Sequence, residues 1–273
     1  MTLEVCCGSP QAVDAAVKRG AQRVELCSAL DLDGLTPPLD WLVDARRRYP
    51  ALRIHVLIRP RPGDFCYTPA EVEQMCTQIE DALSAGADGI VIGCLTPSGD
   101  VDIPAMEKLL ETVRCFELAS ALQSDRCHAS NDEHFFENLN GENFLHSGVG
   151  QQFFDLFSGD KFLVREAQKS FPKSITSHKT GILISVTFHR AFDVCRKPMK
   201  AMEDIIDLGI DRILTSGQAP SAQEGIPLLR RLVKKARGRI IIMPGAGITP
   251  DNLEAIEKAT GASEFHGSRI MGS

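Results

Sequence analysis

Short apolar segments in which polar residues alternate recur along the chain, and stretches with helical periodicity separate them. The first two segments repeat one pattern, Leu3-Glu4-Val5-Cys6 and Val24-Glu25-Leu26-Cys27. Because residues two apart share one face of a strand, each pattern places a glutamate and a cysteine together and the apolar residues opposite. In parallel neighbouring strands the Cys6 and Cys27 thiols would meet at the carboxyl ends, where parallel α/β folds place their chemistry.

The same reasoning along the whole chain predicts eight strands, near residues 3–7, 22–27, 52–58, 88–93, 182–188, 212–215, 239–243 and 263–266. Helical stretches follow the first seven strands, with expected caps at Ser9, Thr36, Thr68 and Thr249 and further helices near 103–114, 197–208 and 221–236. Eight such units predict an α/β fold, a closed (β/α)8 barrel of the TIM type, rather than an open doubly wound sheet. We expect residues 1–273 to form this single domain.

Residues 116–180 interrupt the alternation. They hold nine of the thirteen phenylalanines and are rich in Ser, Asn and Gly, without a clean period. We expect an insertion between helix 4 and strand 5, on the bottom face of the barrel, where it affects assembly or solubility more than chemistry. Its Cys127, His128 and His134 match no standard metal-site spacing.

The end of the chain is the second departure. Only seven residues follow His266, so no eighth helix is evident. We therefore expect an apolar stripe near strands 8 and 1 that is covered by the insertion, by a partner subunit, or by residues missing from this chain.

Composition adds limits to this picture. Charged residues make up 24% of the 273 residues and the net charge is −6, which favours neither nucleic acid nor an anionic membrane as a partner. The apolar runs are too short to cross a bilayer. Nine cysteines, an odd number, without a signal peptide pattern indicate reduced thiols and a cytoplasmic location.

Three arginines follow predicted strands and are candidates for binding an anion. Arg59 and Arg61 flank a proline after strand 3, and Arg190 follows strand 5. Guanidinium groups hold carboxylates and phosphates in fixed geometry. The structural alternative is a network of ion pairs with the acidic residues Glu4, Glu25, Asp64 and Asp193.

Two further features at the strand ends are candidates for chemistry. His189 is a candidate general acid/base or metal ligand, whereas His55, in the middle of strand 3, is expected to be structural. The turn that contains Gly245 and Gly247 precedes a helix and is a candidate phosphate cradle, although glycines also serve simply to turn the chain. Thr215 and Ser216 end the neighbouring strand and are candidate contacts to the same anion.

Several of these segments together resemble the CutC copper homeostasis family, over about residues 3–114 and 184–267. The matching segments are 4–6, 23–28, 58–65, 186–193, 212–217 and 243–248. The resemblance implies a (β/α)8 barrel, a role in copper homeostasis in the cytoplasm, Cu(I) binding at Cys6 and Cys27, and assembly into homo-oligomers. Residues 33–38 and 267–269 depart from the usual pattern of the family.

Two functions remain open at this stage. In the first, the Cys6 and Cys27 thiolates bind Cu(I), with His189 or His266 as a third ligand. In the second, a barrel enzyme acts on a small anionic or phosphorylated metabolite, held by Arg59, Arg61, Arg190 and the turn at Gly245–Gly247. Glu25 and His189 would then transfer protons.

Overall fold

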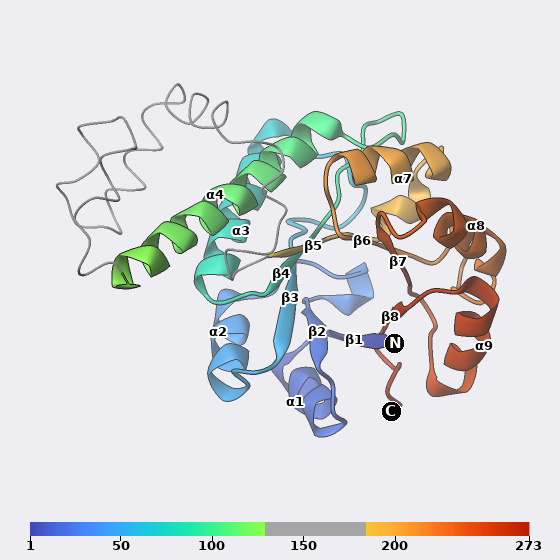
Figure 1. The fold of residues 1–273 in the computed structure, drawn as a ribbon, viewed down its shortest axis with the longest axis horizontal. Coiled ribbons are helices and arrows are strands. Elements are labelled where there is room, and N and C mark those ends of the chain that lie inside the picture. The colour runs from blue at the N-terminus through green and yellow to red at the C-terminus, as the bar shows by residue number, and fades with distance from the viewer. Residues whose placement is uncertain (129–183, 273) are drawn as a thin grey trace. The chain divides into compact units, whose positions relative to one another are not determined.

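The fold is an eight-stranded parallel barrel, seen here in a computed structural model that describes residues 1–128 and 184–272. The strands are β1 (Thr2–Cys7), β2 (Arg23–Leu26), β3 (Arg53–Leu57), β4 (Gly89–Ile92), β5 (Ser185–Phe188), β6 (Arg212–Thr215), β7 (Ile241–Pro244) and β8 (Glu264–Gly267). They pair in the order β7-β6-β5-β4-β3-β2-β1-β8, and β7 lies beside β8, so the barrel is nearly closed (Figure 1). The predicted fold class is therefore confirmed.

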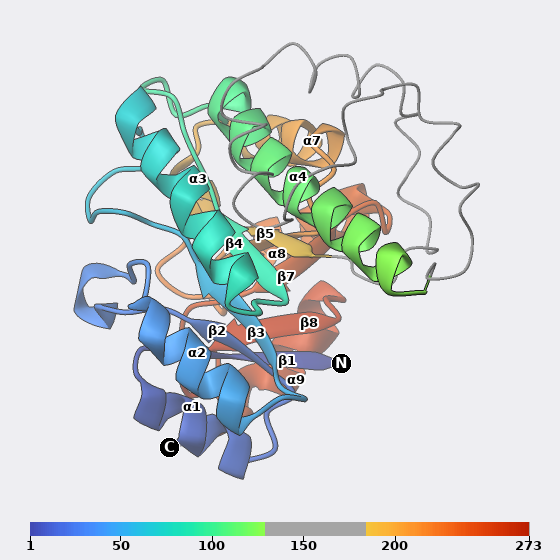
Figure 2. The ribbon, with the colours of Figure 1, turned by 90° about the vertical axis from the view of Figure 1, so that its left-hand side faces the viewer.

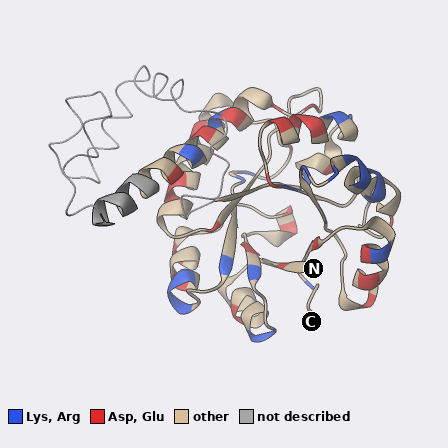
Figure 3. Cartoon of the chain, viewed as in Figure 1, with Lys and Arg blue, Asp and Glu red and all other residues tan. Residues whose placement is uncertain are grey.

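Seven α-helices of the described residues surround the strands: α1 (Pro10–Lys18), α2 (Leu39–Arg48), α3 (Pro69–Ser84), α4 (Ile103–His128), α7 (Pro198–Asp207), α8 (Ile226–Ala236) and α9 (Pro250–Thr260). Figure 2 shows α1, α2 and α3 in succession around the outside of the first strands. Acidic and basic residues are interspersed on these helices (Figure 3).

The predicted helix starts at Ser9, Thr68 and Thr249 are confirmed, because all three are N-caps in the structure. The start at Thr36 is wrong. There α2 begins at Leu39 after the N-cap Pro38, and the Thr36 hydroxyl instead accepts a hydrogen bond from the backbone N–H of Arg59.

The helix predicted for 103–114 continues as α4 to His128, because no glycine or proline interrupts it after Pro104. It therefore carries Cys127 and His128 in its last turn. Most of the predicted insertion, including His134, lies outside the described residues.

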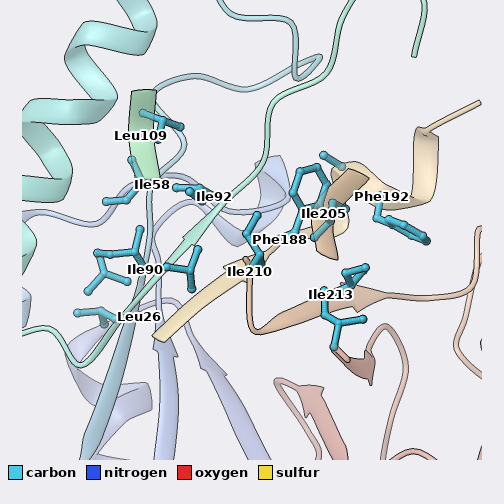
Figure 4. Close-up of a cluster of buried hydrophobic side chains, with 14 of the residues drawn as sticks. Leu26, Ile58, Ile90, Ile92, Leu109, Phe188, Phe192, Ile205, Ile210 and Ile213 are labelled. Atoms are coloured by element: carbon cyan, nitrogen blue, oxygen red, sulfur yellow. The ribbon is translucent and has the colours of Figure 1, made fainter. Parts of the chain in front are cut away.

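The main hydrophobic core lies between the strands and the helices. It includes the outward-facing residues Leu26, Ile90, Phe188 and Ile213, which pack with helix residues such as Leu109 (Figure 4). Burial of this apolar layer provides the main driving force for folding. The face of the strands that lines the barrel is different, because charged and polar side chains occupy most of its positions.

The outer face of β8 is covered within the chain. Phe265 is fully buried and Ile270, in the turn after β8, is 1% exposed. No helix follows β8 in the described residues, and Ile270 takes part of the place that such a helix would fill. Of the apolar stripe expected near β8 and β1, Leu3 and Met271 are partly buried, and Met1, before β1, is exposed.

Candidate functional site

Two cysteines meet at the carboxyl-terminal mouth of the barrel. The Sγ atoms of Cys6 on β1 and Cys27 just after β2 are 3.7 Å apart, as the alternation of the strands predicts. Leu57 and Val91 form a small apolar cluster with them inside the barrel. Cys7, one residue further along β1, belongs instead to the core outside the barrel. Alternation therefore separates two adjacent cysteines into different environments.

A carboxylate and an imidazole complete this mouth. Glu25 Oε2 and His266 Nε2 are in direct contact, and ligand atoms of Cys6, Glu25 and His266 all lie within 4.8 Å of one another. The contact depends on the pairing of β8 with β1 and of β1 with β2, which places three strands side by side. Glu25 and His266 are separated by 241 residues in the sequence.

Proton positions at the mouth follow from this geometry. The hydrogen bond with Cys27 and burial raise the pKa of the Cys6 thiol well above its usual value. Burial opposes the charge of His266, but the Glu25 carboxylate raises the pKa of His266 well above the usual value. Both shifts favour the protonated forms, a neutral Cys6 thiol and a charged His266 ring.

Below the cysteines, a charged network fills the barrel. Glu4 is fully buried, with one carboxylate oxygen 2.7 Å from Arg23 Nε and 3.0 Å from His55 Nδ1. Burial by itself raises the pKa of Glu4, but the His55 hydrogen bond and the charges of His55, His266 and Arg23 lower it to about 2. His55, predicted to be structural, thus contacts a carboxylate inside the barrel.

Glu264 extends the network across the barrel. Its carboxylate lies 2.5 Å from Arg23 Nη2 and 3.2 Å from Arg212 Nε. Arg212 in turn donates to the hydroxyls of Ser185 and Thr187. Sequence analysis missed this part of the network, although charged residues at alternate positions of short strands were a visible signal for it.

Arg59 links two loops at the mouth of the barrel through hydrogen bonds. Its guanidinium donates to the carbonyls of Leu32 and Gly34 at 2.8 Å, and to the carbonyl of Gly63 at 2.9 Å. These bonds join the loop after β2 to the loop after β3. In the described part of the chain, no carboxylate lies within ion-pair distance of Arg59.

The other two predicted anion-binding arginines have acidic partners. Arg61 Nε is 2.5 Å from Glu71 Oε1, and its Nη2 is 3.0 Å from Asp64. Arg190 Nε is 2.8 Å from Asp193. The structural alternative predicted these pairs with Asp64 and Asp193, but Glu4 and Glu25 pair elsewhere.

The Asp193 carboxylate occupies the backbone concavity after β6. It accepts hydrogen bonds from the N–H groups of Ser216 at 3.0 Å and Gln218 at 3.2 Å, and from the Thr215 hydroxyl at 2.5 Å. Concavities of successive N–H groups favour anions. Thr215 and Ser216, predicted to contact a substrate anion, thus use these donors on a carboxylate of the chain itself.

At the turn after β7, the structure accounts for Gly245 through close packing. A Cβ at Gly245 would lie 2.6 Å from the Leu214 side chain. The backbone N–H of Gly245 donates to the Thr215 carbonyl at 3.0 Å. Gly247 has a φ of +76°, which favours glycine. The conformation of the turn alone therefore explains both glycines, without a ligand.

His189 is not part of the group formed by Cys6, Glu25 and His266, and it makes no hydrogen bond with Glu25. Its Nδ1 accepts the N–H of Ala191 at 3.1 Å, and its ring centroid lies 5.0 Å from that of Phe65. Burial and the charge of Arg59 lower the pKa of His189 to about 3, so the ring is neutral. The structure therefore brings Glu25 together with His266, which sequence analysis considered only as a copper ligand.

Comparisons with known proteins agree with this architecture. A sequence model described as the CutC family matches residues 1–152 and 167–271. The chain belongs to the CutC family. A family protein CutC of Bacteroides fragilis is 38% identical over 263 residues, which cover 96% of this chain and 78% of that protein. A second one, from Chromobacterium violaceum, is 36% identical over 266 residues, with 97% and 80% covered.

A solved structure supports the family assignment. It is described as a candidate copper homeostasis protein CutC from Streptococcus agalactiae, with a TM-score of 0.71, 25% identity and 99% of each chain covered. KGPDC from Streptococcus mutans, at 11% identity and a TM-score of 0.53, shares the fold. Among the described residues of this CutC family chain, no helix has both the length and the apolar composition needed to span a membrane.

Proposed function

We propose that this chain takes part in copper homeostasis in the cytoplasm by binding Cu(I) through the thiolates of Cys6 and Cys27. The observation that carries the proposal is the 3.7 Å between the two sulfurs at the mouth of the barrel. Modest rearrangement lets both sulfurs bind one ion, and soft thiolates select a soft d10 cation. The description of the Streptococcus agalactiae relative as a candidate copper homeostasis protein supports the same role.

The surroundings of the sulfurs fit such an ion. Leu57 and Val91 shield one side from water, and His266 offers Nε2 as a third ligand once that nitrogen loses its proton. His266 is preferred to His189 because only His266 lies with Cys6 in a group of potential ligands. None of the eight cysteines whose side chains the structure describes is in a disulfide, which supports a reducing compartment.

The test is an anaerobic titration with Cu(I) in competition with bicinchoninate. The wild type is expected to take up one Cu(I), and the variants Cys6→Ser and Cys27→Ser are expected to lose it. Cys7→Ala is the matched control, because Cys7 adjoins Cys6 in sequence but faces the outer core. Retention of tight Cu(I) binding by the double serine variant would contradict the proposal.

A second candidate function is catalysis on a small anionic metabolite. The buried contact between Glu25 and His266 supports it, since a carboxylate and an imidazole in one mouth form an acid–base pair. This function predicts a ligand that still binds after both thiols are removed and that needs the Glu25–His266 pair for turnover. A Cys6→Ser/Cys27→Ser protein separates the two candidates, because only the copper function requires the sulfurs.

A further inference from the structure

Three buried polar atoms near the ends of β3 and β5 have no well-aligned hydrogen-bond partner in the described part of the chain. They are Arg59 Nε, Tyr67 Oη and His189 Nε2. Arg59 and His189 are each only 4% exposed. Buried polar groups in folded proteins are nearly always paired, so three unpaired atoms in one region indicate a missing partner.

All three atoms offer hydrogens. Nδ1 of His189 accepts the N–H of Ala191, which assigns the ring hydrogen to Nε2 of the neutral imidazole. Arg59 Nε always carries a hydrogen, and the Tyr67 hydroxyl is free to donate because burial raises its pKa. The partner that satisfies them must therefore be an acceptor.

The charge of Arg59 favours an anionic acceptor. Its other nitrogens are held by the carbonyls of Leu32, Gly34 and Gly63, which are neutral groups. Arg61 and Arg190, by comparison, each have a carboxylate partner. Arg59 is thus a buried cation without a counter-ion, an arrangement that is unfavourable unless an anion is supplied.

Arg59 and His189 both lie against Phe65, and the Tyr67 ring lies against the neighbouring Arg61. The Cζ of Arg59 lies 5.0 Å from the centre of the Phe65 ring, and the His189 ring centroid also lies 5.0 Å from it. Tyr67 follows two residues later. Burial raises its pKa, and the charge of Arg59 and a side-chain contact with Arg59 act against this rise, so the two side chains are neighbours. Phe65 is itself only partly buried, so part of its side chain reaches solvent beside Arg59 and His189.

We propose that the carboxylate or phosphate group of a small metabolite binds to Arg59, Tyr67 and His189 when the Phe65 ring turns aside. The site lies after β3 and β5, apart from the turn at Gly245–Gly247. It uses neither sulfur and so stands independently of copper binding. In the structure the Phe65 ring lies against Arg59 and His189, and its π face offers Arg59 a weaker substitute for an anion.

The site is tested by calorimetry and thermal stabilisation with two probes, inorganic phosphate and succinate, at constant ionic strength. The wild type is expected to bind one probe or both in a saturable manner, and their ranking tells a phosphate ligand from a carboxylate ligand. Tyr67→Phe and His189→Gln are each expected to weaken binding by about fivefold or more, as for loss of one hydrogen bond. Tyr49→Phe is the matched control and should leave binding within about twofold, because Tyr49 lies at the end of α2 with Asp14 and Arg48.

The variant Phe65→Ala decides whether the ring covers the site. Removing it should tighten binding of the same probe severalfold, because the donors no longer have to be uncovered. Arg59→Gln is a weaker test, since Arg59 also fastens two loops and its loss affects folding. Absence of saturable binding to both the wild type and Phe65→Ala would overturn the proposal. So would binding that a Tyr67→Phe/His189→Gln protein retains.

Discussion

The sulfur atoms of Cys6 and Cys27 lie 3.7 Å apart although the two residues are not paired in register. Cys6 pairs with Glu25, and Cys27 lies two residues beyond it, so the sulfurs meet on a diagonal across neighbouring strands. Glu25 occupies the position directly opposite Cys6, and its carboxylate contacts His266. One mouth therefore presents two thiols and one imidazole toward the same space.

This arrangement makes His266 the third copper ligand in the proposed function. We expect His266→Gln to lower Cu(I) affinity by about tenfold and to change the site from three-coordinate to two-coordinate. X-ray absorption at the copper edge of the loaded protein measures the coordination directly. His189→Gln should leave the spectrum unchanged, because His189 lies with Phe65 and not with the sulfurs. An identical spectrum for His266→Gln and the wild type would exclude His266 as a ligand.

Glu4 is expected to make the stability of the fold depend on acid pH. Its pKa is about 2 in the folded protein, against 4.5 for an unperturbed glutamate. Because the folded value is the lower one, ionised Glu4 stabilises the fold above about pH 4.5, and this contribution is lost as the pH falls toward 2. The shift corresponds to roughly 3 kcal/mol.

The variant Glu4→Gln tests this dependence. At pH 7 its free energy of unfolding should be lower than that of the wild type by roughly 3 kcal/mol, because Arg23 and His55 lose a buried counter-charge. Urea denaturation at a series of pH values should show the difference shrinking below pH 4.5. Glu254→Gln on the exposed face of α9 is the control and should change stability by less than about 0.5 kcal/mol. A difference that stays constant from pH 7 to pH 3 would contradict the assignment.

The barrel and the cysteine pair were predictable because both depend on local alternation. Once β1 and β2 are parallel neighbours, a period of two places Cys6 and Cys27 on one face without further information. The contact between Glu25 and His266 is different, since it exists only because the last strand pairs with the first. Closure of the barrel depends on the whole chain, and no local sequence pattern predicts which side chains this closure brings together.

The arginines show a second limit of sequence analysis. Arg59, Arg61 and Arg190 share the same chemistry, but their partners depend on loop conformation. Arg59 binds carbonyls of two loops, while Arg61 and Arg190 bind nearby carboxylates. A guanidinium can donate to either kind of acceptor, so residue type alone does not separate the roles. The start of α2 was missed for a related reason, because the Thr36 hydroxyl binds Arg59 instead of capping a helix.

Asp193 is expected to hold the loop after β6 in place. Its carboxylate accepts hydrogen bonds from the N–H groups of Ser216 and Gln218. Asp193→Asn removes the charge and one acceptor oxygen, so we expect a loss of roughly 1.5–3 kcal/mol of stability and faster amide exchange at residues 216–218. Hydrogen–deuterium exchange with mass spectrometry measures this local effect. Asp204→Asn, which breaks an exposed pair with Lys200, should not alter exchange at this loop.

Gly93 is expected to be required by the His189 ring. A Cβ at residue 93 would lie 2.7 Å from both Cε1 and Nδ1 of His189, closer than packed atoms allow. Gly93→Ala should therefore lower the free energy of unfolding by roughly 1–3 kcal/mol, through displacement of the ring. In a His189→Ala background only Phe188 Cζ, at 3.3 Å from the new Cβ, has to give way, so the same substitution should cost less than about 1 kcal/mol. Urea denaturation of the four proteins in this double-mutant cycle measures the coupling. Additive effects of the two substitutions would show that Gly93 and His189 are not in the contact described.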